Sequence, residues 1–138
     1  FNVASQSAAG MTKLPHGGED RSRGVIVNTS SMAAFEGQIG HAAYSASKAG
    51  IVGLTLPMAR DLARDGIRVM TIAPGIFNTS MASEIKEKHK RKILENQAFP
   101  KRQGKTNEFA SLVIQCIDNP MLNGETIRLD AGCRMPPK

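Results

Sequence analysis

Residues 24–31, Gly-Val-Ile-Val-Asn-Thr-Ser-Ser, give the first indication of the fold class. The first five of these residues form a β-branched run without polar alternation, which is typical of a strand buried on both faces. A second run of this kind, Ile-Arg-Val-Met-Thr-Ile-Ala at 67–73, stops at Pro74-Gly75. Strands buried on both faces belong to parallel sheets, so the two runs predict an α/β fold with a parallel sheet.

The remaining segments complete an alternation of helices and strands. The sequence pattern predicts, in chain order, a helix tail at 1–13, a loop at 15–23, a long helix at 41–64, a polar helix at 80–97, an amphipathic helix at 106–118 and a strand at 125–129. Gly66 lies where a left-handed C-cap is expected, and Pro57 predicts a kink or local break in the long helix. Ligands of such sheets bind beyond the carboxyl ends of the strands, so we expect binding residues at 29–38, 74–79 and 130–132.

The composition excludes several classes of protein. The 138 residues, 41% hydrophobic and 22% charged, are typical of a single globular domain. No apolar run approaches the roughly 18 residues that cross a bilayer, so membrane insertion is not expected. Cys116 and Cys133 cannot form a disulfide framework, and the three histidines are scattered, so no metal site is predicted. The net charge of +6 permits binding to phosphates.

Tyr44 and Lys48 form a Tyr-x-x-x-Lys pattern near the start of the predicted long helix. A spacing of four places both side chains on one face of a helix. An adjacent ammonium stabilises a phenolate, so a phenol paired in this way can exchange a proton with an alcohol or carbonyl oxygen. Ser31, at the carboxyl end of the first strand, supplies a hydroxyl that would hold that oxygen. Ser31, Tyr44 and Lys48 are therefore candidate catalytic residues.

A simpler interpretation exists for each part of this pattern. A Tyr-x-x-x-Lys pair by itself is more often a surface pair, and Ser30 and Ser31 could be turn residues. The combination is more specific than its parts: a buried strand ends in serine, a helix of small residues carries the pair, and a second buried strand ends in Pro-Gly.

This combination resembles the C-terminal half of the classical short-chain dehydrogenases/reductases over essentially all 138 residues. Ser31, Tyr44 and Lys48 match the catalytic triad of that family, and residues 74–79 (Pro-Gly-Ile-Phe-Asn-Thr) match its cofactor segment. The resemblance implies that Tyr44 is the general acid/base, that Lys48 assists it and binds the nicotinamide ribose, and that Ser31 orients the substrate oxygen. The implied fold is the C-terminal portion of a Rossmann-type doubly wound parallel sheet.

The resemblance also implies a cofactor, a substrate class and partners. The implied cofactor is NAD, and the implied cofactor-binding residues are Tyr44, Lys48, Pro74, Gly75, Ile76, Phe77 and Thr79. Segments such as 33–38 and 55–63 are most similar to family members that oxidise 3-hydroxyacyl-CoA, with hydroxysteroids as further substrates, and Gln38 would approach the substrate. Such relatives imply a homotetramer and a mitochondrial location.

Two other functions stay open at this point. The first is an NADPH-dependent 3-oxoacyl or carbonyl reductase, because the residue that discriminates NAD from NADP is not among these residues. The second is a non-catalytic subunit in mitochondrial tRNA processing, which is the one context in which nucleic acid is an implied partner. The presence of Ser31, Tyr44 and Lys48 together weighs against a loss of catalysis.

The glycine-rich phosphate loop of the family, Gly-x-x-x-Gly-x-Gly, has no match in this sequence. We therefore expect residues 1–138 to form a partial Rossmann-type domain without the glycine-loop half, and to be inactive by themselves.

The run Lys-Glu-Lys-His-Lys-Arg-Lys at 86–92 concentrates positive charge. Its simplest interpretation is a solvated face of a helix. The alternative is that it steers the phosphates of coenzyme A toward the site.

Overall fold

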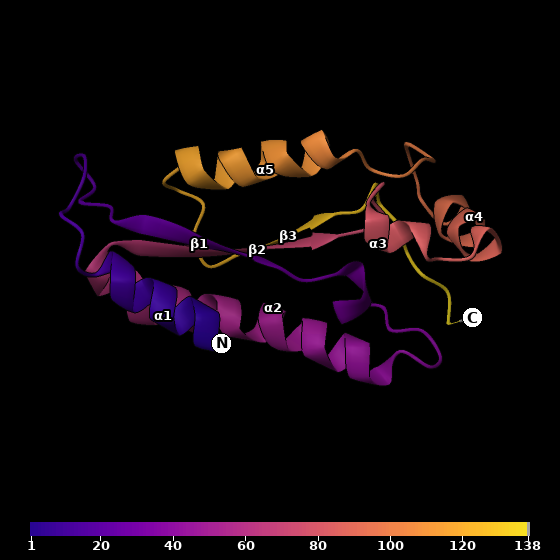
Figure 1. Ribbon diagram of the computed structural model, residues 1–138, viewed down its shortest axis with the longest axis horizontal. Coiled ribbons are helices and arrows are strands. Elements are labelled where there is room, and N and C mark those ends of the chain that lie inside the picture. The colour runs from indigo at the N-terminus through magenta and orange to yellow at the C-terminus, as the bar shows by residue number, and fades with distance from the viewer. Residues whose placement is uncertain (138) are drawn as a thin grey trace.

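A computed structural model describes residues 1–137 of the chain, and its centre is a sheet of three parallel strands. The strands are β1 (Gly24–Thr29), β2 (Ile67–Pro74) and β3 (Thr126–Leu129), and β2 lies between the other two (Figure 1). Both pairings are parallel. The predicted parallel α/β sheet is therefore confirmed.

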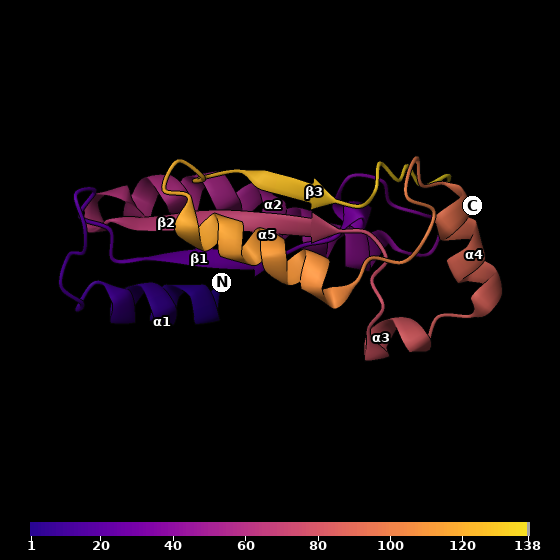
Figure 2. The same cartoon turned by 90° about the horizontal axis from the view of Figure 1, so that it is seen from above.

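Helices cover both faces of this sheet. They are α1 (Asn2–Met11), α2 (Ala42–Leu62), α3 (Ser80–Ser83), α4 (Glu87–Glu95) and α5 (Thr106–Asp118), with short 3-10 turns η1 (Met32–Ala34) and η2 (Ala63–Asp65). Figures 1 and 2 show α1 and α2 on one face, α5 on the other, and α3 and α4 beyond the carboxyl ends of the strands. No helix in the described part of the chain is long and apolar enough to span a membrane.

Strand β2 explains why the sheet is a stable platform. Successive side chains of a strand point to opposite faces, so β2 contributes to two separate clusters. Val69 packs in one buried cluster with Met58 of α2, and Ile72 packs in the other with Cys116 of α5. Val69, Ile72 and Cys116 are completely buried.

The end of the long helix follows the sequence prediction, whereas its interior does not break. Gly66 has a φ of +67°, and a Cβ at that position would lie 2.5 Å from the backbone oxygen of Arg21, so glycine is required there. The helix runs through Pro57 without interruption, although proline removes one backbone hydrogen bond. Thr55 and Met58 on either side of Pro57 are buried against the sheet, and this packing holds the helix together.

The prediction of a single helix at 80–97 is wrong, because the structure has two shorter helices there. The Thr79 hydroxyl caps α3 by accepting a hydrogen bond from the Ala82 N–H, and α3 ends after one turn. Lys86 has an extended ψ of 136°, which separates α3 from α4. Ile85, between the helices, packs against a buried cluster that also contains Ile93 of α4. The break in the helix thus coincides with the packing of Ile85 against this cluster.

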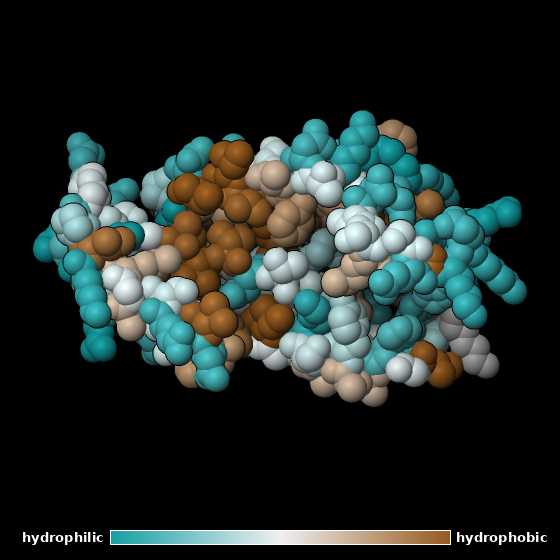
Figure 3. All heavy atoms as spheres, viewed as in Figure 1, coloured by the Kyte–Doolittle hydropathy of each residue, from teal (hydrophilic) through white to brown (hydrophobic). Residues whose placement is uncertain are grey.

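Strand β1 is less buried than its sequence predicts. Of its residues only Ile26 is buried, while Val25 and Val27 are half-buried. The reason is its position, since β1 is an edge strand of the sheet formed by the described residues. Figure 3 shows apolar side chains gathered over β1 and the adjacent parts of α1 and α5.

Candidate active site

Ser30 joins the carboxyl end of β1 to both β2 and α2. Its N–H donates to the backbone oxygen of Ile72 at 2.8 Å, which extends the sheet pairing past the end of β1. Its hydroxyl donates to the backbone oxygen of Lys48 at 2.8 Å. Ser30 is almost completely buried, so the start of α2 is fixed against the end of the strand at this point.

Ser31 follows with an extended backbone, φ −162° and ψ 156°, and serves as the N-cap of η1. Its hydroxyl oxygen accepts a hydrogen bond from the Ala33 N–H at 3.1 Å. This hydrogen bond uses the oxygen as an acceptor and orients the side chain. The O–H of Ser31 is then left to donate to a ligand oxygen.

Tyr44 and Lys48 lie one turn apart on α2, as the spacing predicts. The Lys48 ammonium lies 5.7 Å from the centre of the Tyr44 ring and donates to the backbone oxygen of Thr29 at 3.3 Å. Tyr44 is 46% exposed, and the ring of His41 packs edge-on against its ring, with the ring centres 6.5 Å apart. The phenol is therefore accessible to a ligand, while the strand end holds the ammonium beside it.

The segment that follows β2 forms the next part of the site. The Gly75 N–H donates to the Leu129 backbone oxygen at 2.9 Å, and a Cβ on Gly75 would lie 3.0 Å from Asp130. The small residue therefore allows this segment to pass close to the end of β3. Phe77 then packs edge-to-face on Phe109 of α5, with their ring centres 5.9 Å apart.

These elements surround one cavity of about 620 Å³ at the carboxyl ends of β1 and β2. Nearly all the predicted site residues line it: Ser31, Tyr44, Lys48, Pro74, Gly75, Ile76, Phe77 and Thr79. Gln38 does not line it, because its side-chain amide donates to the backbone oxygen of Pro136 at 3.2 Å. Of the segments in which we expect ligand residues, 29–38 thus lines the cavity only with residues 29–32, whereas 74–79 lines it with all residues except Asn78.

The cavity has an apolar side that the sequence analysis missed. Ala82 of α3, Ile85, and Ile93 of α4 line it, and we call these three residues the helical wall. Ile85 and Ile93 are apolar residues within a strongly polar stretch, and this was the signal that could have identified them.

The third expected segment, 130–132, does not line this cavity. Asp130 and Ala131 line a second, smaller cavity of about 210 Å³. The Asp130 side chain is 5% exposed and forms an ion pair with Arg128 at 2.6 Å. Its place is therefore in an ionic network rather than in the predicted ligand site.

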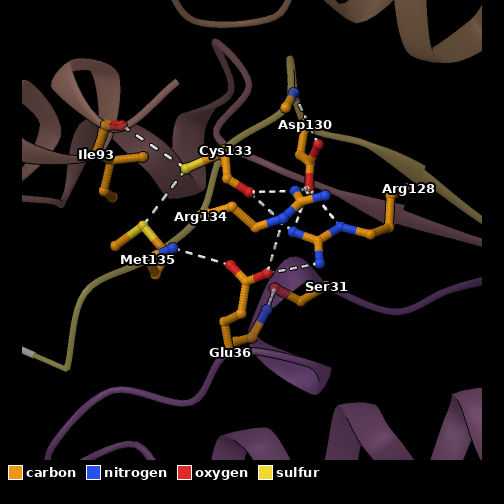
Figure 4. A network of polar contacts seen from close by, with 10 residues as sticks. Ser31, Glu36, Ile93, Arg128, Asp130, Cys133, Arg134 and Met135 are labelled. Carbon is orange, nitrogen blue, oxygen red and sulfur yellow. Dashed lines mark hydrogen bonds and ion pairs between the residues drawn. The ribbon is translucent and has the colours of Figure 1, made fainter. Parts of the chain in front are cut away.

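That network, drawn in Figure 4, connects the loop after Ser31 with the end of the chain. Arg128 donates to Glu36 at 2.7 Å, and the guanidinium of Arg134 lies 3.5 Å from the same carboxylate oxygen. Burial raises the pKa of the Glu36 carboxyl, but hydrogen bonds from Arg128 and from the Met135 N–H outweigh burial and hold the pKa below its usual value. Glu36 therefore stays ionised in the folded protein at neutral pH.

The basic run lies on α4, and part of its charge is paired. Lys90 is mostly buried and forms an ion pair with Glu87 at 2.6 Å, and Arg91 pairs with Glu95 at 3.1 Å. Lys88 is exposed. Within the described residues, no group of three or more His, Cys, Asp or Glu side chains could hold a metal ion.

A comparison with protein families matches residues 1–90 to the model of the short chain dehydrogenases. The 3-hydroxyacyl-CoA dehydrogenase type-2 of Homo sapiens is 55% identical over 139 residues, which cover 99% of this chain and 52% of the relative. The chain therefore spans about half the length of the curated relatives it matches.

Two solved structures have the same fold. The 3-hydroxyacyl-CoA dehydrogenase type-2 from Mycobacterium avium has a TM-score of 0.90 and 44% identity, and the match covers 99% of this chain and 53% of the other. A 7 alpha-hydroxysteroid dehydrogenase complexed with NADH and 7-oxo glycochenodeoxycholic acid has a TM-score of 0.85 and 27% identity, covering 100% and 52%.

Proposed function

This chain belongs to the short-chain dehydrogenase family, and from that premise we propose that it carries the catalytic residues of an NAD-dependent 3-hydroxyacyl-CoA dehydrogenase. The reaction would convert the secondary alcohol of a 3-hydroxyacyl-CoA into the ketone of a 3-oxoacyl-CoA. The observation that carries the proposal is the convergence of Ser31, Tyr44 and Lys48 on one cavity with the segment after β2. The similarity to 3-hydroxyacyl-CoA dehydrogenases over nearly the whole chain supports the substrate class.

We assign the proton transfer to Tyr44. The substrate hydroxyl would give its proton to the Tyr44 oxygen while the adjacent carbon loses hydride, and the reverse transfers would reduce a ketone. The Lys48 ammonium lies 5.7 Å from the centre of the Tyr44 ring and would place a positive charge beside the Tyr44 oxygen during this transfer. Ser31 would donate its free O–H to the substrate oxygen and fix the distance to Tyr44.

The cavity also has the chemistry that a nicotinamide nucleotide needs. Hydroxyl and ammonium groups of Tyr44, Lys48 and Thr79 line it together with the apolar Pro74 and Ile76. The polar groups suit a ribose and a carboxamide, and the apolar surface suits the flat ring. Gly75 and Phe77 complete the cofactor side. When bound, the nicotinamide accepts the hydride that the alcohol carbon loses.

The proposal has further parts that rest on the resemblance. Small residues on the exposed side of α2, including Ala46, Gly50 and Gly53, would allow close packing in a homotetramer. Gln38 would act at the substrate side through the loop that follows Ser31. A mitochondrial location and a role beside tRNA-processing proteins are the remaining expectations of this kind.

The test is an assay of the natural protein with 3-hydroxybutyryl-CoA and either NAD or NADP, followed by the absorbance of the reduced nicotinamide. We expect turnover with NAD and at least about a hundredfold lower kcat/KM with NADP, because a pocket built for one ribose substituent rejects the other. A preference for NADP would favour the 3-oxoacyl or carbonyl reductase. No turnover with either cofactor, in a protein that is folded by circular dichroism, would contradict the proposed activity.

A further inference from the structure

The C-terminal segment (residues 130–137) returns across the loop that follows Ser31. Three residues of that loop, Glu36, Gln38 and Ile39, hydrogen-bond three successive residues of the segment, Met135, Pro136 and Pro137, at 2.9, 3.2 and 3.1 Å. The partners are close to 100 residues apart in the chain, so these contacts belong to the tertiary structure and not to a local turn.

Glu36 makes the strongest of these connections. One of its carboxylate oxygens accepts from Arg128 at 2.7 Å and the other accepts from the Met135 N–H at 2.9 Å. Arg128 also donates to the Cys133 backbone oxygen at 2.9 Å. The side chains of Glu36 and Arg128 are only 19% and 22% exposed, so water weakens this pair less than a surface pair.

The C-terminal segment in turn supports the cavity. Cys133 is completely buried in a cluster with Ile93 and Ala82 of the helical wall, and Met135 packs against the same cluster. The cluster also contains Met32, the residue that follows Ser31. In Figure 4, Cys133 points toward Ile93 while Glu36 reaches the segment from the opposite side. The segment therefore contacts both the Ser31 loop and the helical wall.

We propose that Glu36 is a positioning residue for the substrate: by binding the C-terminal segment to the loop after Ser31, it fixes the distance between Ser31 and the helical wall. This rests on the proposed function for the identity of the substrate. The helical wall supplies apolar surface to the cavity, so its distance from Ser31 decides how well an acyl chain is enclosed while its oxygen is held. Glu36 does not line the cavity and would not contact the substrate, so it acts through the C-terminal segment.

The first experiment compares Glu36→Gln with the wild type in the natural protein, using 3-hydroxybutyryl-CoA and 3-hydroxyhexadecanoyl-CoA. Loss of contact with one or two methylene groups of the longer chain would lower its kcat/KM about four- to fifteenfold. We expect little change for the short chain. A variant that is only partly folded contains a smaller fraction of active enzyme, which lowers kcat/KM for both substrates by the same factor. An unchanged ratio of the two values would overturn the proposal.

Glu95→Gln is the matched control. Glu95 forms an exposed ion pair with Arg91, and its side chain is 61% exposed. The same chemical change there should leave the ratio of the two kcat/KM values within about twofold of the wild type. A shift as large as that of Glu36→Gln would attribute the effect to general loss of charge and would overturn the proposal.

A second measurement does not depend on activity. Cys133 and Cys116 are both free and completely buried, but only Cys133 lies in the C-terminal segment. In Glu36→Gln we expect a maleimide to label Cys133 about tenfold faster than in the wild type, with Cys116 unchanged, as judged by peptide mass. Equal labelling of Cys133 in both proteins would overturn the proposal even if the protein has no dehydrogenase activity.

A truncated variant that ends at Arg134 tests the same connection from the other side. It removes the Met135 N–H and leaves Glu36 and Arg128 in place. We expect the same selective loss of kcat/KM for the long chain. A ratio equal to that of the wild type would show that the segment does not support the helical wall, and the proposal would be wrong.

Discussion

The two sides of the cavity are built in different ways. On one side, Ser31 and Lys48 are attached to the ends of strands and helices by hydrogen bonds to the backbone, and residues 69–73 of β2 beneath them are buried between two helix layers. On the other side, the helical wall consists of one residue from each of two short helices and Ile85 between them, and of the three only Ala82 and Ile93 are buried. The second side depends on side-chain packing with a distant part of the chain.

The difference suits the two tasks that the proposed function would require, proton transfer and the enclosure of an acyl chain. Proton transfer requires groups placed within a few tenths of an ångström, and strand ends provide this precision. Enclosing an acyl chain requires apolar area but little direction. We therefore expect substitutions on the sheet side to affect chemistry and folding, and substitutions on the helical side to affect the choice of substrate.

The largest expected effect is that of Tyr44→Phe. Loss of a general acid/base lowers the chemical rate by about 10²- to 10⁴-fold. Because Lys48 and Thr79 still line the cavity, the affinity for NAD should fall far less than the rate. Measurement of kcat and of NAD binding in the natural protein checks this. Near-normal turnover in Tyr44→Phe would contradict the assignment of Tyr44 as the general acid/base.

The second comparison pairs Ile72→Ala with Ile85→Ala. Ile72 is completely buried in β2, so its truncation should cost about 2–5 kcal/mol of the free energy of unfolding. Ile85 is half-buried, so the same change there should cost about 1 kcal/mol or less and should mainly raise KM for long acyl chains. Urea unfolding monitored by circular dichroism gives both energies. Equal losses in the free energy of unfolding for the two variants would contradict the difference proposed between the sheet side and the helical side of the cavity.

A smaller effect should appear in the pH dependence of stability. The pKa of Glu36 is lowered in the folded protein, so its interactions stabilise the fold above the unfolded-state pKa of about 4.3 and are lost as pH falls through the folded value. The stability difference between wild type and Glu36→Gln should therefore shrink below about pH 4. Urea titrations at several pH values measure it, and a difference that is independent of pH would speak against the ionised carboxylate.

The smallest expected effect belongs to α4. If Lys88 attracts the phosphates of coenzyme A, Lys88→Glu should raise KM for a 3-hydroxyacyl-CoA by up to about fivefold at low salt. The increase should fade at high salt, and an alcohol substrate without coenzyme A should show none. Equal changes in KM for both substrates would favour the interpretation of the basic run as a solvated face of the helix.

The sheet side could be predicted from sequence because its signals are local. Val25, Val27 and Ser31 lie within one short segment, and Tyr44 and Lys48 lie within one helical turn. Strand composition and a spacing of four are sufficient to place such residues. The half-burial of β1 was missed because it depends on which strands are neighbours, and the run of apolar residues does not report this.

The helical side could not be predicted in the same way. The break between α3 and α4 coincides with the packing of Ile85 against a cluster that contains Cys133. The pairing of Glu36 with Arg128 joins residues 92 positions apart, and neither residue stands in a motif. Such contacts form only when the complete tertiary structure brings distant segments together, so the helical wall and the position of Gln38 emerged from the structure alone.

The position of Ser30 has a consequence for motion. Its N–H is bound to β2 and its hydroxyl to the first half of α2, so the strand ends and the helix that carries Tyr44 must move as one rigid body. Helix α3 is a single turn, and Ala82 is its one buried residue, so it is held less firmly than these elements. In hydrogen–deuterium exchange, the Ser30 amide would belong to the slowest class, and the amides of α3 to a fast one.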